Sequence, residues 1–212
     1  TGRRPKLGRL FDAGKKGGDN LMKYVADFSD WQEGIDFAEI AKHFDGVIVK
    51  ITEGTAPQSC FRDFINQAVA HNLQWGVYCF THAQTVERAV EEADQVMSLL
   101  PGKPGLGIWF DVEDPNVLAL DRHKITAIVS AFISRCNASG YAAGVYASFS
   151  TLNDRIITGA LASYVPYWVA AYSFYRNPLA DSGLNVAGWQ YRDDYIIGAH
   201  HVDASEWYSM GD

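Results

Sequence analysis

The sequence predicts one α/β domain built on a barrel-like or open sheet of parallel strands. From residue 24 onward, short β-branched or aromatic runs alternate with helical periods, and the links between them are short. The 212 residues are 48% hydrophobic, which suffices for one well-cored domain and is short for two. No linker, internal repeat or low-complexity tract divides this body.

Seven segments are expected to form strands, because they are short, rich in β-branched or aromatic residues and bounded by turn residues. They cover residues 24–27, 46–52, 75–80, 107–113, 143–148, 167–172 and 186–191. Helical periodicity fills the intervals, most clearly in residues 61–72, where apolar positions recur near i, i+3, i+4 and i+7. Helices are expected over residues 37–44, 61–72, 85–100, 121–140 and 150–161.

Two helix boundaries carry specific signals. Thr85 offers the hydroxyl of an N-cap, and Pro101 follows the end of the same helix. Gly140 is expected to end the next helix. Beyond about residue 162 the helical patterns become sparse, so loops are expected to join the last strands.

The charge of the chain is acidic and uneven. The formal net charge of −7 disfavours nucleic acid as a partner, because phosphate binding needs a basic surface. Residues 1–23 are the exception, with seven Lys or Arg against two Asp. We interpret them as a flexible basic extension, with an electrostatic tether to an anionic surface as the alternative. Residues 24–212 then form the folded domain.

Cysteine usage and hydropathy bear on the compartment. Cys60, Cys79 and Cys136 are odd in number and lack metal-ligand spacing, so we expect free thiols. The first residues show no apolar signal-peptide core, which leads us to expect synthesis in a reducing cytoplasm. No apolar run approaches the ~18 residues that cross a bilayer, so no membrane insertion is expected.

The stretch GIWFDVEDP breaks an apolar strand with acids. Side chains at i and i+2 of a strand share a face, so Trp109, Asp111 and Glu113 are expected to point into a barrel. Phe110 and Val112 would then face outward. The carboxyl ends of barrel strands carry the chemistry of such folds, and burial beside a like charge raises a carboxyl pKa. A raised pKa suits a general acid that works near neutral pH.

Acids also stand at two other expected strand ends. Asp27 closes the first strand in YVADFSDWQ, and Asp203 follows a short apolar step in HHVDASEWY. If the sheet closes, both converge with Asp111 and Glu113 at one mouth. Each alone could be a solvated turn residue, but together they favour a catalytic cleft.

Aromatic side chains are expected at the same mouth. They are Trp31, Tyr78, Phe80, Tyr146, Tyr172, Trp189 and Tyr191. Sugars offer C–H faces to aromatic rings and hydroxyls to polar neighbours, so a cleft of acids and aromatics suits a carbohydrate chain. For Trp75 and Trp168 we expect core packing instead.

Eight segments, taken in order, resemble the glycoside hydrolase family 25 lysozymes, also called the Chalaropsis type, which are common among phage endolysins and bacterial autolysins. The segments are ADFSDWQ, VIVKITEGT, GVYCF, FDVED, GVYAS, YWVAAY, GWQY and HVDAS. They extend from about residue 24 to residue 207. Any one is a weak signal, and the order and spacing of the eight carry the resemblance.

The resemblance implies an irregular (β/α)5(β)3 TIM-like barrel as a single α/β domain, with residues 24–212 as its catalytic unit. Members of the family are muramidases, which cleave the β-1,4 bond between N-acetylmuramic acid and N-acetylglucosamine in peptidoglycan. Their catalytic carboxylates fall on Asp27, Asp111, Glu113 and Asp203, and Glu113 takes the place of the general acid. Asp111 would orient the 2-acetamido group of the substrate or stabilise the oxazolinium formed when that group attacks the anomeric carbon.

The resemblance leaves the stereochemical course open. Assistance by the substrate's own acetamido group gives retention, and the alternative is a direct inverting attack by water that Asp27 or Asp203 activates. Cys79 and Thr81 depart from a frequent Tyr-His-Phe-Ala pattern, which affects substrate contacts but none of the four acids. The substrate groove of the family falls on Lys50, Glu53, Tyr78, Phe80, Tyr146, Tyr172 and Gln190.

Three functions follow from these observations: an active muramidase, a catalytically silent wall-binding or phage structural protein, and a hydrolase of another acetamido sugar polymer such as chitin. The complete acid set argues against a silent binder, and GIWFDVE lacks the extra upstream aspartates of chitinases. The muramidase hypothesis needs no metal or other cofactor. It implies a monomer whose partner is the peptidoglycan glycan strand and which acts on the bacterial cell wall.

Overall fold

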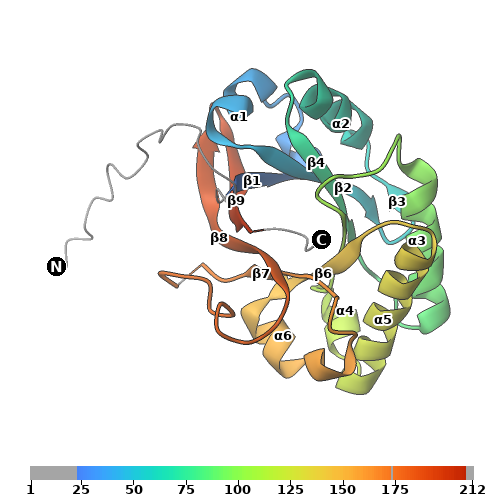
Figure 1. Ribbon diagram of the computed structural model, residues 1–212. Coiled ribbons are helices and arrows are strands. Elements are labelled where there is room, and N and C mark those ends of the chain that lie inside the picture. Colours follow the sequence, from blue (N-terminus) through green and yellow to red (C-terminus); the bar gives the residue numbers. More distant parts are fainter. Residues whose placement is uncertain (1–22, 173, 209–212) are drawn as a thin grey trace.

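The computed structural model describes residues 23–172 and 174–208, and in them the strands close into a barrel (Figure 1). The predicted basic extension over residues 1–23 lies outside this part of the chain, apart from Lys23. The barrel strands are β1 (Lys23–Phe28), β2 (Gly46–Glu53), β4 (Gln74–Phe80), β5 (Ile108–Asp111), β6 (Ala143–Ser148), β7 (Tyr167–Ala170), β8 (Val186–Ile197) and β9 (His200–Trp207).

The strands follow one another around the wall in the order β1-β9-β8-β7-β6-β5-β4-β2, and pairing of β1 with β2 closes the ring. The two-residue strand β3 (Ala56–Pro57) pairs with the end of β2. Each pair from β1 through β2, β4, β5, β6 and β7 to β8 is parallel, as predicted. The last strand differs, because β9 runs antiparallel to both β8 and β1.

The β8–β9 hairpin explains this departure. Gly198, at φ +58°, lies between the two strands and gives the backbone the left-handed conformation of a tight turn. So short a connection cannot carry the chain back to start a parallel strand. The hairpin also makes β8 longer than predicted, since the strand continues to Ile197 instead of ending at residue 191.

Six helices are described: α1 (Phe37–His43), α2 (Phe61–Ala70), α3 (Val86–Leu99), α4 (Pro115–Leu118), α5 (Arg122–Ala138) and α6 (Phe149–Asp154). Thr85 caps α3 by accepting a hydrogen bond from the Arg88 N–H, and Gly140 follows α5 at φ +82°, both as predicted. The single helix expected over 150–161 is wrong, because α6 ends early and a separate 3-10 turn covers Thr158–Ala160. The short α4 was not predicted.

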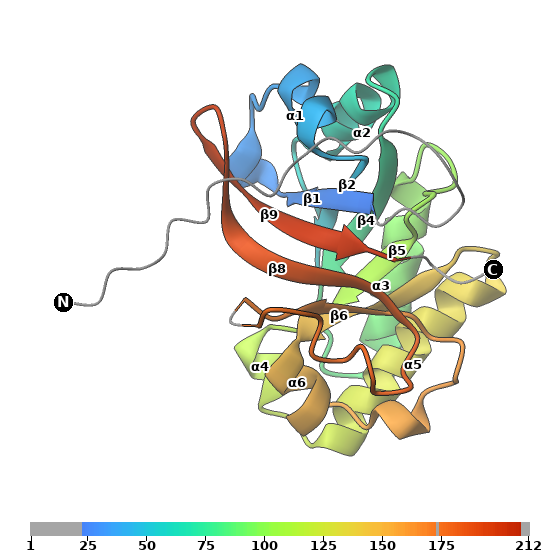
Figure 2. The ribbon, with the colours of Figure 1, turned by 60° about the vertical axis from the view of Figure 1, so that its left-hand side comes forward.

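The helices pack on the outside of the barrel, whereas the β8–β9 hairpin forms a wall without a helix over it (Figures 1 and 2). On the helix side, the Phe110 ring of β5 stacks on Phe132 of α5 at 4.1 Å between centroids. Trp109 points the opposite way, into the barrel, where it is fully buried. The alternation predicted for this strand is therefore confirmed.

Three tryptophans fill the barrel interior. Trp109, Trp168 and Trp207 contact one another edge to face, with centroids 5.3 to 5.9 Å apart. Two of the buried indole N–H groups have hydrogen-bond partners, since Trp109 donates to the Leu106 carbonyl and Trp168 to the Ser205 hydroxyl. The polar residues of the barrel mouth lie next to this packed layer, and Trp168 contributes to the same cavity.

Two strand glycines make room for these indoles. A Cβ on Gly144 would lie 2.5 Å from the Trp109 ring, and one on Gly188 would lie 2.5 Å from the Trp207 ring. Such distances are well inside van der Waals contact. Glycine at these positions is thus required by the close approach of a large ring to the barrel wall.

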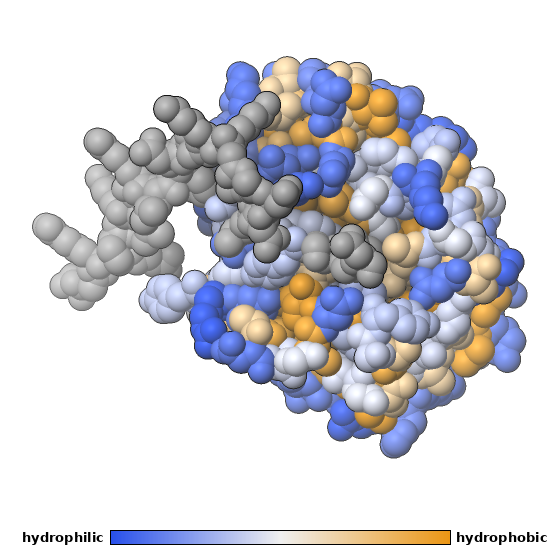
Figure 3. All heavy atoms as spheres, in the orientation of Figure 1, coloured by the Kyte–Doolittle hydropathy of each residue, from blue (hydrophilic) through white to orange (hydrophobic). Residues whose placement is uncertain are grey.

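The thiols are free and the visible surface is largely polar. Cys60, Cys79 and Cys136 form no disulfide, as predicted. Within residues 23–172 and 174–208, no helix has the length and apolarity to cross a membrane. Hydrophilic side chains cover much of the face in Figure 3, and apolar residues are scattered among them.

Candidate active site

A cavity of about 150 Å³ opens where the parallel strands end. Its position is the one that α/β barrels use for chemistry. All four acids singled out from the sequence reach it. It is lined by Asp27, Tyr78, Asp111, Glu113, Tyr146, Trp168 and Asp203.

Asp27 and Asp203 face each other across neighbouring strands, because β1 and β9 pair at these two residues. The side-chain amide of Gln190 on β8 joins them. Its nitrogen donates to Asp27 Oδ2 at 2.8 Å and to Asp203 Oδ2 at 3.2 Å. The hairpin that departs from the parallel pattern therefore brings the first and the last acid of the chain together.

Gln190 is fully buried and uses both ends of its amide. Its carbonyl oxygen accepts hydrogen bonds from the hydroxyls of Tyr146 at 2.9 Å and Tyr172 at 2.7 Å. The oxygen of this amide thus faces the phenols and its nitrogen faces the acids. This arrangement fixes the two aspartates relative to the tyrosine side of the mouth.

Asp111 and Glu113 occupy the opposite side. The strand β5 ends at Asp111, two residues earlier than predicted, so Glu113 projects from the segment that follows it. Asp111 is 4% exposed, and its Oδ1 is buried without a hydrogen-bond partner in the described part of the chain. Buried polar atoms are almost always paired, so this oxygen is available to an incoming donor.

The environment raises the pKa of all four acids. Burial is the main cause in each case. Negative neighbours add to it: Asp203 acts on Asp27, and Glu113 acts on Asp111. The pKa of Asp203 rises to about 6, with further contributions from Asp193 and Glu113.

Opposing contacts limit some of these shifts. The Gln190 hydrogen bond lowers the pKa of Asp27, and the charge of Lys50 lowers the pKa of Asp111. A hydrogen bond from the Ser148 backbone works against burial at Glu113. The mouth therefore combines carboxyl groups that hold protons more tightly than usual with the nearby cation of Lys50.

The predicted groove residues lie around this cavity in two groups. Tyr78 and Tyr146 line it, and Tyr172 and Gln190 are joined to its acids through hydrogen bonds. On β2 and β4, the Lys50 ammonium binds Glu53 at 2.7 Å and stands 4.8 Å from the centre of the Phe80 ring. Lys50, Glu53 and Phe80 are outside the cavity lining.

Two aromatic predictions are wrong. Trp189 and Tyr191 pack on the outer side of the barrel, where the Trp189 indole donates to the Ala171 carbonyl. Strand alternation explains both errors, because their neighbour Gln190 points inward and they must point outward. Trp168, predicted only as core, also lines the cavity, whereas Trp31 is 89% exposed just beyond β1.

Sequence reasoning missed a histidine beside the site. His82 follows β4 and contacts both Glu53 and Asp114. Its position just past a parallel strand end was a usable signal, the same one that identified Asp27. Across residues 23–172 and 174–208, no three His, Cys, Asp or Glu side chains are grouped in a way that could hold a metal ion.

Comparison with known proteins places this geometry in a family. The model of glycosyl hydrolases family 25 matches residues 26–200. No curated protein matches the chain. The sequence segments on which the resemblance rested all lie within or next to the matched range.

Solved structures show the same fold. A family 25 glycosyl hydrolase from Bacillus anthracis is 19% identical with a TM-score of 0.74, over 95% of this chain and 95% of that one. The bacterial lysozyme of Streptomyces coelicolor is 22% identical with a TM-score of 0.75, over 89% and 93%.

A third similar structure is longer. The modular autolysin LytC of Streptococcus pneumoniae is 24% identical with a TM-score of 0.73, over 88% of this chain and 47% of that one. The chain thus spans about half the length of LytC. The match of the family model over most of the sequence, together with the barrel fold, shows that the chain belongs to glycosyl hydrolases family 25.

Proposed function

We propose that this chain is a peptidoglycan hydrolase, a muramidase that cleaves the β-1,4 bond between N-acetylmuramic acid and N-acetylglucosamine. One observation carries the proposal: four carboxyl groups with raised pKa converge on one cavity in a family 25 barrel. Similar structures include a bacterial lysozyme, a muramidase and LytC in complex with a synthetic peptidoglycan ligand.

In this proposal Glu113 is the general acid. Breaking a glycosidic bond requires a proton on the leaving oxygen, and the donor must still be protonated at working pH. Burial raises the pKa of Glu113, and the side chain lines the cavity from a segment beyond the strand. It then donates its proton to the oxygen of the departing sugar.

Asp111 assists an attack from within the substrate. The carbonyl oxygen of the 2-acetamido group adds to the anomeric carbon as the glycosidic bond breaks, which gives an oxazolinium ion. The unpartnered Oδ1 of Asp111 is free to accept a hydrogen bond from the acetamido N–H. That hydrogen bond holds the acetamido group in place and stabilises the positive charge that develops on it.

Water completes the reaction. The ionised Glu113 takes a proton from water, the water oxygen bonds to the anomeric carbon, and the oxazolinium ring opens with overall retention. The inverting alternative needs an ionised Asp27 or Asp203 to activate water. The retaining course is supported by the contacts of the acids: Oδ1 of Asp111 is buried without a partner in the described part of the chain and can accept from the acetamido group, whereas Asp27 and Asp203 both already accept hydrogen bonds from the Gln190 amide.

The remaining groove residues bind the glycan chain. Tyr78 and Tyr146 present rings and hydroxyls at the cavity, and Gln190 and Tyr172 hold the acids at its far side. Lys50, Glu53 and Phe80 extend the groove beyond the cavity lining. We place the site of action at the bacterial cell wall and treat the active species as a monomer.

The test is the identity of the new chain ends. Purified peptidoglycan is digested, reduced with borohydride and hydrolysed to sugars. A muramidase converts newly exposed N-acetylmuramic acid ends to muramicitol. Glucosaminitol would show cleavage of the other glycosidic bond, and binding without new ends would show a silent wall-binding protein. Either result contradicts the proposal.

A further inference from the structure

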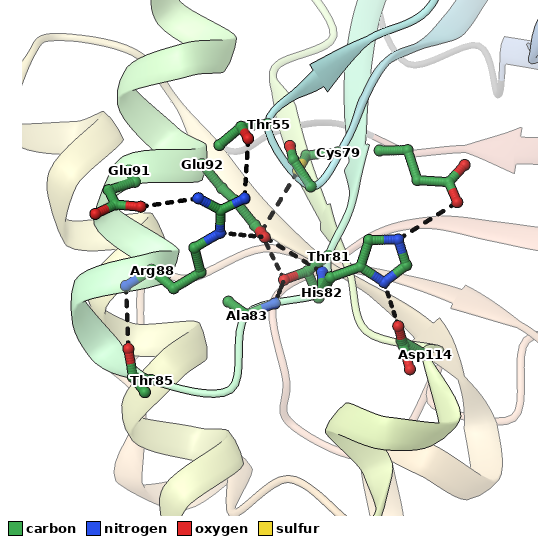
Figure 4. Close-up of polar contacts among 12 residues, drawn as sticks. Thr55, Cys79, Thr81, His82, Ala83, Thr85, Arg88, Glu91, Glu92 and Asp114 are labelled. Carbon is green, nitrogen blue, oxygen red and sulfur yellow. Dashed lines mark hydrogen bonds and ion pairs between the residues drawn. The ribbon is translucent and has the colours of Figure 1, made fainter.

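His82 bridges two carboxylates that belong to different strand ends. Its Nδ1 contacts Oδ2 of Asp114, which follows β5, and its Nε2 lies 3.3 Å from Oε1 of Glu53, at the end of β2 (Figure 4). The Phe80 ring packs against the imidazole edge to face at 5.4 Å. The imidazole thus spans the gap between β2 and β5 above β4.

The two contacts demand a particular protonation state. A carboxylate only accepts hydrogen bonds, so each of the two ring nitrogens must carry a proton to serve its partner. Neutral imidazole has one N–H and the imidazolium has two. Partial burial alone lowers the pKa of His82, but the hydrogen bonds to Asp114 and Glu53 outweigh it and raise the pKa above 6.5.

The backbone that carries His82 is held by a buried acid. Glu92 of α3 is fully buried and accepts hydrogen bonds from the Thr81 hydroxyl at 2.6 Å and from the His82 N–H at 3.3 Å (Figure 4). The Ala83 N–H donates to the same Thr81 oxygen at 2.9 Å. These contacts fix the direction of the chain just where the imidazole leaves it.

Both carboxylate partners of His82 are next to residues of the candidate active site. Asp114 is the residue after Glu113, and its Oδ1 caps α4 by accepting from the Asn116 N–H. Glu53 binds the Lys50 ammonium at 2.7 Å, and the charge of Lys50 lowers the pKa of Asp111. The His82 imidazole therefore connects the segment that carries Glu113 with Lys50, whose charge acts on Asp111.

We propose that His82, as an imidazolium, is a positioning residue that ties the ends of β2 and β5 together and so aligns Glu113 with the Lys50–Asp111 side of the mouth. It touches no reacting atom and acts through Asp114 and Glu53. The charged groups that face His82 are these two carboxylates and Glu92 of α3. Lys50 lies behind Glu53, and the Arg88 guanidinium lies 3.9 Å from the Glu92 carboxylate. The kinetic part of this inference rests on the proposed muramidase activity.

The experiment compares kcat/KM on peptidoglycan for the wild type and His82→Gln across a pH series. At low pH the wild type exceeds the variant by about tenfold, because a hydrogen-bonded charge is lost. As pH rises through the pKa of His82, the wild type loses the imidazolium as well, and the ratio falls toward one. A role in folding alone gives a ratio that does not change with pH.

His43→Gln is the matched control. His43 is also a partly exposed histidine bound to a carboxylate, with Nε2 3.2 Å from Glu39, but its partners lie on α1 and β8. Its ratio to the wild type stays near one at every pH. A flat ratio for His82→Gln, or an equal response of the two variants, overturns the proposal.

An NMR titration separates this inference from the proposed function. In the wild type the His82 imidazole titrates above pH 6.5, and in Asp114→Asn its midpoint falls by about one pH unit. Asparagine still caps α4, so the helix is kept. An unchanged midpoint overturns the bridge, whereas a chain that shows the shift but no turnover contradicts only the muramidase.

Discussion

Asp203 is a site residue whose ionisation lowers the stability of the fold. Burial, Asp193 and Glu113 raise the pKa of its carboxyl group to about 6 from an ordinary value of 3.8. The native state therefore holds this proton more tightly than the unfolded chain does. The stabilisation that follows is complete below about pH 4 and is lost as pH rises through the folded pKa.

We expect Asp203→Asn to be more stable than the wild type at pH 7 by about 1–2 kcal/mol, because the amide cannot ionise. The gain shrinks to nothing below about pH 4, where both side chains are neutral. Urea unfolding at several pH values measures it. Asp154→Asn is the control, since Asp154 is exposed. Equal pH dependence of stability in the wild type and Asp203→Asn would show that the Asp203 proton is not the cause.

Individual site residues were predictable where strand alternation or a strand end fixed them. Asp27, Asp111, Glu113 and Asp203 all line the cavity, as the sequence predicted for strand-end acids. The partners of Gln190 were not predictable, because its four hydrogen bonds join residues far apart in the chain. Such contacts depend on how the barrel closes, which local patterns do not encode.

At the scale of elements, the large rings inside the barrel constrain the strands that surround them. The strand β6 passes so close to Trp109 that a Cβ on Gly144 would meet the ring at 2.5 Å and the Pro166 carbonyl oxygen at 2.6 Å. Neither neighbour is the flexible end of a side chain. The strand β6 can therefore pack against Trp109 at this distance only because residue 144 is glycine.

Gly144→Ala is expected to lower the free energy of unfolding by about 1–3 kcal/mol, because strand or ring must shift to admit the methyl group. Thermal or urea unfolding measures the change. Gly102→Ala is the matched control, since a Cβ there meets nothing within 4 Å. A loss no larger than that of the control would show that the inner layer is loosely packed.

The strand segments were predicted better than their ends and directions. Seven of the barrel strands overlap the predicted segments, because β-branched and aromatic runs marked them. The antiparallel β9 was expected only as the segment HVDAS, since its direction depends on the turn at Gly198. The tryptophan of β8 was misplaced because an aromatic residue does not itself show which face of a strand points inward, and Trp189 alternates with the inward-facing Gln190.

At the scale of the whole molecule, the last strand, β9, both closes the barrel and completes the site. The strand β9 pairs with β1 and β8, carries Asp203 to Asp27, and ends on Trp207 against Trp109 and Trp168. Closure of the ring and assembly of the acids therefore depend on one element. Loss of its anchor should weaken both.

Trp207→Ala is expected to cost about 3–5 kcal/mol of stability, as large core truncations do, and to lower turnover through displacement of Asp203. Urea unfolding and the peptidoglycan assay measure the two effects. Trp31→Ala is the stability control, because Trp31 is 89% exposed and Trp207 is 3% exposed. Similar unfolding of the two variants would contradict the anchoring role of Trp207.

The most direct test of the proposed mechanism is digestion of purified peptidoglycan by the wild type and by Glu113→Gln, with the new reducing ends identified by mass spectrometry. Glutamine keeps the shape of the side chain and removes its proton, so the variant should fold and bind but form no new ends. The wild type should form ends on N-acetylmuramic acid. Near-normal turnover by Glu113→Gln would contradict the assignment of the general acid and with it the proposed mechanism.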